Sequence, residues 1–182
     1  MAENFELSKG EKKFVGLHIL FAVAALSVGA LFGPLQALEH AGLKVGGKDL
    51  YDLMKPLVAS YYQGLTLHGV LNALIWTTFF ITGFLTLTVI FGLKRSLRYP
   101  RLNAVGFWMM VVGLLTAAVP ILLNQASVLY TFYPPLQASP FFYIGLVLVV
   151  VGSWVEGWGF YLTYMAWRKE NPQTRTPFIT FG

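Results

Sequence analysis

The stretch SYYQGLTLHGVLNALIW, Ser60 to Trp76, is mostly apolar but carries a histidine, His68, near its middle. The run from Pro56 to Leu93 contains no Asp, Glu, Lys or Arg. Because the hydrocarbon core of a bilayer is crossed by about 20 apolar residues in a helix, this run predicts a long membrane-spanning helix. An imidazole inside such a helix is costly unless it is bonded to something, so its partner is the first question.

The rest of the chain has the composition of a membrane protein. Of its 182 residues 56% are hydrophobic and 12% are charged, whereas soluble domains average about 25% charged residues. We expect an all-α protein with one four-helix transmembrane bundle over residues 14–167 and charged tails at 1–13 and 168–182. The uncharged runs place the four spans at about 14–37, 60–93, 103–124 and 141–167.

The distribution of Lys and Arg predicts the orientation. The two tails and the short loop between the second and third spans together hold 10 of the 13 basic residues. Basic residues concentrate on the cytoplasmic side of membrane proteins, so we expect both termini to be cytoplasmic. The net charge of +5 is thereby explained as a topology signal, and we infer no nucleic-acid partner from it. The chain contains no cysteine, which excludes thiolate metal sites and covalent c-type haem attachment.

His68 lies on a stripe of the second span that also carries Tyr61, Gly64 and Asn72. Neutral imidazole is a common ligand of haem iron, and its second nitrogen then needs a hydrogen-bond partner. The backbone carbonyl of Gly64 and the side chain of Asn72 are candidate partners, and Gly64 also leaves room for a flat macrocycle or for a closely packed helix. The alternative is a histidine that is hydrogen-bonded to a neighbouring helix and binds no cofactor.

Two further ionisable residues fall within predicted spans. His18 lies near the cytoplasmic end of the first span, so it should not share an iron with His68, and we interpret it as an interfacial histidine that reaches the lipid headgroups. Glu156 lies near the centre of the fourth span. It is a candidate proton relay or a contact with a partner helix; the alternative is an acid hydrogen-bonded across the helix interface.

Glycines recur at seven-residue spacing on the third and fourth spans, at Gly106 and Gly113 and at Gly145, Gly152 and Gly159. Such stripes of small residues let membrane helices approach closely. The loop 125–140 is uncharged, aromatic and rich in proline, so we expect it to fold back onto the bundle or against a partner.

Three motifs in the same order resemble the N-terminal part of subunit I of the haem–copper oxygen reductases, most closely the B-type (ba-type) cytochrome oxidases. They are LFGPLQAL at the end of the first span, YYQGLTLHG in the second, and ASVLYTFYPPL before the fourth. The resemblance extends from about Glu11 to Thr180. It implies that His68 is an axial ligand of the low-spin haem, a haem b or haem a. The B-type pattern has no counterpart of His18 or Glu156.

The resemblance also implies what lies elsewhere. In the family the opposite axial ligand, the histidines of copper B and the ligand of the high-spin haem come from later helices, and a dinuclear copper centre lies in subunit II. Only His18 and His40 accompany His68 here. We therefore expect the N-terminal piece of a split catalytic subunit of a terminal oxidase, in a prokaryotic plasma membrane. Its expected partners are a second chain with the remaining helices, subunit II, and cytochrome c or a similar donor.

Two alternatives belong to other classes of protein. One is a scaffold or proton-conducting subunit without haem that uses Glu156. The other is a stand-alone b-type cytochrome in which His68 pairs with a ligand from a second copy of the chain.

Overall fold

Four long helices make up the computed structural model, which describes residues 5–55 and 57–177. All four are long and apolar enough to cross a membrane: α1 (Lys9–His40), the continuous helix Tyr61–Leu93, α5 (Pro100–Leu122) and α6 (Pro140–Glu170). The prediction of an all-helical protein with four spans is thus confirmed. The predicted tail positions 1–4 and 178–182 lie outside the described residues.

Local sequence signals explain where these helices begin. Ser8 and Glu11 form a capping box at the start of α1. Ser60 caps the second span by accepting a hydrogen bond from the Gln63 backbone N–H at 3.1 Å. Proline occupies the first turn of both α5 and α6, where its missing N–H costs no helical hydrogen bond.

The second span is not a uniform α-helix. It consists of α3 (Tyr61–Gly69), a π-helical segment η1 (Val70–Ile75) and α4 (Trp76–Leu93). The π segment starts two residues after His68 and contains Asn72. Sequence periodicity did not predict it, and such segments occur often at functional sites.

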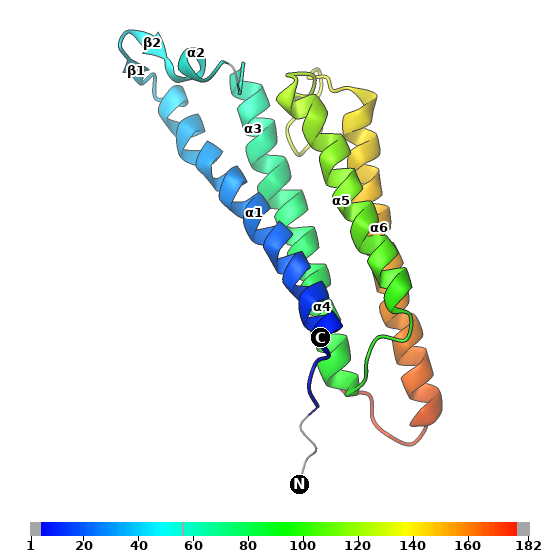
Figure 1. Ribbon diagram of the computed structural model, residues 1–182. Helices are drawn as coiled ribbons and strands as arrows, with labels where there is room; N and C mark the ends of the chain where they lie inside the picture. The colour runs from blue at the N-terminus through cyan, green and yellow to red at the C-terminus, as the bar shows by residue number, and fades with distance from the viewer. Residues whose placement is uncertain (1–4, 56, 178–182) are drawn as a thin grey trace.

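The bundle consists of two helix pairs (Figure 1), α1 with α3–η1–α4 and α5 with α6. The start of α1, the α4–α5 connection and the end of α6 lie at one end of the bundle, where Arg95 and Glu170 form an ion pair at 3.0 Å. At the other end a short hairpin of β1 (Lys44–Val45) and β2 (Lys48–Asp49) leads into α2 (Leu50–Met54).

The glycine stripes, which predicted close helix packing, lie between α5 and α6. A Cβ atom added to Gly152 would lie 2.6 Å from the carbonyl oxygen of Gly106, and one added to Gly113 would lie 2.6 Å from that of Gly145. These two helices therefore pack backbone to backbone, which any larger residue at these positions would prevent.

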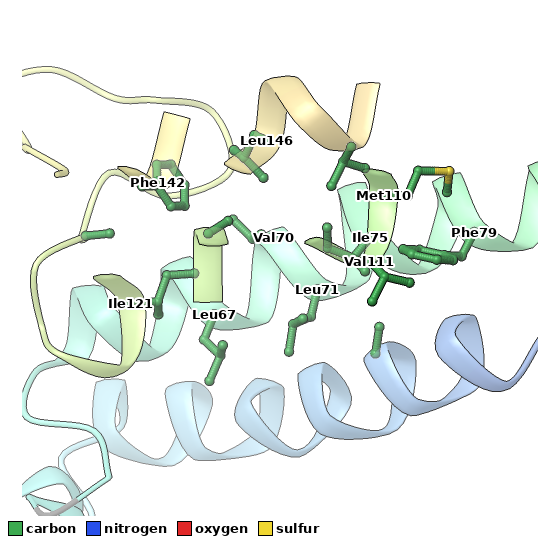
Figure 2. Packing of buried hydrophobic residues seen from close by; sticks show 14 of the residues in the cluster. Leu67, Val70, Leu71, Ile75, Phe79, Met110, Val111, Ile121, Phe142 and Leu146 are labelled. Carbon is green, nitrogen blue, oxygen red and sulfur yellow. The ribbon is translucent and has the colours of Figure 1, made fainter. Parts of the chain in front are cut away.

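Buried apolar side chains join the two helix pairs (Figure 2). The cluster includes Leu67, Val70, Leu71, Ile75 and Phe79 from the second span, Met110, Val111 and Ile121 from α5, and Phe142 and Leu146 from α6. The loop between α5 and α6 folds back onto the second span, as expected: the Leu129 N–H donates to the Thr66 hydroxyl at 3.0 Å, and Tyr130 lies against Gly69.

Candidate functional site

His68 lies in the last turn of α3 and faces α1. Its Nδ1 is 2.8 Å from the backbone carbonyl oxygen of Gly29, and its side chain is half-buried. A carbonyl oxygen can only accept a hydrogen bond, so Nδ1 carries a proton and is the donor to the Gly29 carbonyl. The neutral ring is then held in the tautomer that leaves the lone pair on Nε2, which is the form that binds a metal.

Asn72 is the second polar neighbour of the ring. Its amide nitrogen is placed 3.1 Å from Nδ1, and its Oδ1 is buried without a hydrogen-bond partner among the described residues. Since Nδ1 is already a hydrogen-bond donor, it cannot accept from the Asn72 amide nitrogen. Asn72 can join this hydrogen bond only if its side-chain amide is rotated so that Oδ1 faces Nδ1 and accepts. That rotation would also satisfy the otherwise unpaired Oδ1.

Two glycines of α1 make the room for this arrangement. A Cβ added to Gly33 would lie 3.0 Å from Cε1 of His68, and one added to Gly29 would overlap Oδ1 of Asn72. Neither glycine was among the predicted site residues. The signal was nevertheless present, because Gly29 and Gly33 are four residues apart and so lie on one face of the helix.

Gly64 lies at a close helix contact, which is the second of the two alternatives given for it. Among the described residues its carbonyl accepts no hydrogen bond from the imidazole ring of His68; Nδ1 donates to Gly29 on the neighbouring helix instead. The space beside Gly64 is filled by the Tyr51 hydroxyl and the Gln36 side chain, so this glycine serves close packing of α1, α2 and α3. Gln36 and Tyr51 are also hydrogen-bonded to each other.

The chemistry of this donor set fits a haem iron better than a bare metal ion. Residues 5–55 and 57–177 contain no group of three or more His, Cys, Asp or Glu side chains that could hold an ion. A haem supplies four ligands from its own ring and needs only axial ones from protein. Over the same residues Nε2 of His68 makes no hydrogen bond, so it is free to act as one such ligand.

His18 and Glu156 meet in the other half of the bundle. Nε2 of His18 on α1 lies 3.0 Å and 3.1 Å from the two carboxyl oxygens of Glu156 on α6, and both side chains are 0% exposed. The interpretation of His18 as a headgroup-facing histidine is therefore wrong, because it points into the bundle. Eleven residues of α1 separate it from Gly29, or about 16 Å at 1.5 Å per residue, so the two histidines belong to separate sites.

Fold and site together define a multi-span helical membrane protein with a half-buried imidazole, that of His68, whose Nδ1 is hydrogen-bonded and whose Nε2 has no hydrogen-bond partner among the described residues. A family model described as cytochrome c and quinol oxidase polypeptide I matches residues 13–182. The chain therefore belongs to the family of haem–copper oxidase subunit I.

Two relatives show how much of that subunit is present. The chain is 40% identical over 176 residues to cytochrome c oxidase subunit 1 of Thermus thermophilus, which covers 94% of this chain and 30% of the relative. It also superposes with a TM-score of 0.80 and 37% identity on a chain of a haem–copper terminal oxidase dimer solved by cryo-electron microscopy, covering 94% of this chain and 28% of that one. The chain thus spans less than a third of the length of these two relatives.

Proposed function

We propose that this chain binds the low-spin haem of a terminal respiratory oxidase through His68. The observation that supports it most directly is the hydrogen bond from Nδ1 to the Gly29 carbonyl, which holds Nε2 in its metal-binding form. The family implies haem and copper cofactors. When bound, the haem supplies one-electron transfer, while the protein orients the ligand and excludes water.

In this proposal the residues around His68 hold one ring orientation. The Gly29 carbonyl accepts a hydrogen bond from the Nδ1–H group, Asn72 supports the same edge of the ring, and Gly33 lets α1 approach Cε1. Hydrogen bonding to the distal ring nitrogen makes the ligating nitrogen more basic. The Gly29 carbonyl is therefore expected to influence the potential of the haem as well as its position.

The complete reaction, reduction of oxygen to water with proton translocation, is a proposal for the complex. Copper B, the high-spin haem and the opposite axial ligand would come from the remaining subunit I helices, and a dinuclear copper centre from subunit II. We propose that the complex is a B-type enzyme of a prokaryotic plasma membrane that receives electrons from cytochrome c or a similar donor. Haem and copper analysis of the purified complex tests this: a complex without copper, or with a single haem, would refute it.

The orientation belongs to the same proposal. The end of the bundle that holds the start of α1, the α4–α5 connection and the end of α6 carries most of the basic residues and is placed in the cytoplasm. His68 then lies in the outer half of the bilayer and the His18–Glu156 pair in the inner half.

The test of His68 compares two histidine variants of the assembled complex. His68→Ala should remove the low-spin haem and its reduced α-band, whereas His40→Ala, at an exposed position at the end of α1, should leave both unchanged. Size-exclusion chromatography checks that each variant still assembles. An unaltered low-spin spectrum in His68→Ala would contradict the proposal, and a wild-type complex without haem would favour a scaffold.

A further inference from the structure

The hydrogen bonds of the His18–Glu156 pair indicate how many protons the two side chains carry. Nδ1 of His18 lies 3.0 Å from the carbonyl oxygen of Phe14, one turn back on α1. Since a carbonyl only accepts, Nδ1 carries a proton. Nε2 faces both oxygens of Glu156, and without a further proton its lone pair would face a carboxylate. One shared proton between Nε2 and the carboxyl group turns this repulsion into a hydrogen bond.

The surroundings favour the uncharged form of the pair. Phe14, Phe79 and Phe107 pack around the His18 ring, with ring centroids 4.7 Å to 6.3 Å from it. A Cβ added to Gly83 would lie 2.7 Å from His18 Cβ, and one added to Gly106 would lie 2.7 Å from Glu156 Cγ. In such apolar surroundings separated charges are costly. These surroundings therefore favour the form in which the imidazole accepts a hydrogen bond from a carboxylic acid over the form with two separated charges.

No other titratable side chain is among the described contacts of His18 and Glu156, so no third group compensates a charge on the pair. The neighbours from α4 are Phe79 and Gly83, and those from α5 are Gly106, Phe107 and Asn103, whose amide donates to the Glu156 backbone carbonyl at 3.1 Å. The charge state of the site is thus decided by His18 and Glu156 alone.

A cavity of about 310 Å³ approaches this pair from the proposed cytoplasmic end. It is lined by Ser8, Gly10, Glu11 and Phe14 from the start of α1 and by Ser96 and Leu97 from the α4–α5 connection. Ser8 and Gly10 are exposed, so the cavity opens at the end of the bundle. Phe14 belongs to both features: it lines the cavity, and its backbone carbonyl accepts the hydrogen bond from Nδ1 of His18.

We propose that His18 and Glu156 form a one-proton site inside the bundle, and that this proton exchanges with water in the cavity behind Phe14. In each exchange the proton on Glu156 passes to a cavity water and a proton from water replaces it, so the net charge of the site is unchanged. The site lies in the half of the bundle opposite to His68 and does not depend on whether His68 binds haem.

Infrared spectroscopy of the complete complex in lipid, with ¹³C-labelled glutamate, tests the proton itself. The wild type should show a carboxylic acid C=O band that shifts in D₂O, and Glu156→Gln should remove that band. Glutamine is a close isostere of glutamic acid, and its amide can still donate to Nε2 of His18, so this variant should assemble normally and keep its haem spectrum. Loss of the band can then be assigned to the carboxyl group of Glu156 itself. A wild-type band that never responds to D₂O, or a carboxylate band in its place, would overturn the proposal.

Two variants of cavity-end glycines test the route between the cavity and the pair without changing His18 or Glu156. Gly10 lines the cavity, and an added Cβ there would meet only Ser8 Oγ at 4.0 Å. Gly10→Leu should therefore fill the cavity and slow the deuterium shift of the band several-fold. Gly16→Leu is the matched control, because Gly16 is exposed on the same helix with nothing within 4 Å. Equal exchange rates in the two variants would exclude this route.

Discussion

Nδ1 of His68 and the backbone carbonyl oxygen of Gly29 lie 2.8 Å apart, across the contact between α3 and α1. The acceptor belongs to a residue 39 positions earlier in the chain, on a different helix. A backbone acceptor cannot be removed by changing a side chain. The orientation of the ring therefore depends on how closely the two helices approach, and this approach can be tested.

Enlarging Gly33 should disturb His68 directly. A Cβ at this position would lie 3.0 Å from Cε1, so the ring or α1 has to move, and overpacking of this kind typically costs about 1–3 kcal/mol. We expect Gly33→Ala to shift the reduced low-spin α-band and its midpoint potential. Gly16→Ala on the same helix meets nothing within 4 Å and should leave both unchanged, so identical spectra in the two variants would count against the placement of His68.

Removing the Asn72 side chain should loosen the haem while leaving the ligand in place. Loss of a hydrogen-bonding neighbour of a ligating histidine typically weakens metal binding by about 10–100-fold. We expect Asn72→Ala to release haem at least about tenfold faster to apomyoglobin, although the low-spin spectrum persists. A release rate equal to that of the wild type would mean that Asn72 does not support the ring.

The contact between α5 and α6 should tolerate no methyl group at its centre. A Cβ on Gly152 would lie 2.6 Å from the Gly106 carbonyl oxygen and 2.9 Å from the Met110 backbone nitrogen; neither backbone atom can move without separating the helices. We expect Gly152→Ala to destabilise the bundle by about 2 kcal/mol or more. Gly157→Ala, on the same helix with nothing within 4 Å, is the control in thermal unfolding in detergent.

Tyr51 should make the non-cytoplasmic end of the proposed topology sensitive to alkali. Burial, with a contribution from nearby Glu39, raises the pKa of its phenol from the ordinary value of 10.0 to about 12. The neutral phenol is thus favoured in the fold, so its contribution to stability is complete below pH 10 and is lost as the pH rises through about 12. The melting temperature should fall over this range in the wild type and fall less in Tyr51→Phe. An equally steep fall in both proteins would assign the effect to other groups.

Much of the architecture followed from composition and spacing. The uncharged runs predicted the four spans because a bilayer leaves no alternative to long apolar helices. The glycine repeats predicted close helix packing, and the structure shows it between α5 and α6. For the uncharged loop, folding back onto the bundle was one of the two expected outcomes. The family was already indicated by three motifs in order, and the match over residues 13–182 confirms it.

The details of the sites were less predictable. Asn72 was found because it lies one turn from His68 on the same helix, but Gly29 was missed because its contribution is a backbone carbonyl from another helix. The π segment escaped detection because it leaves no mark on hydrophobic periodicity. His18 was assigned to the headgroups because the sequence indicates its depth in the membrane but not the direction in which its side chain points.

The sequence by itself determined the number of spans, the family and the candidate ligand, because each of these depends on short stretches of sequence and not on contacts between helices. Only the tertiary structure decided that His68 donates to Gly29 and that His18 meets Glu156, 138 positions away. The physical reason is that a hydrogen bond between helices depends on the rotation and depth of both, and these are set by packing over the whole bundle.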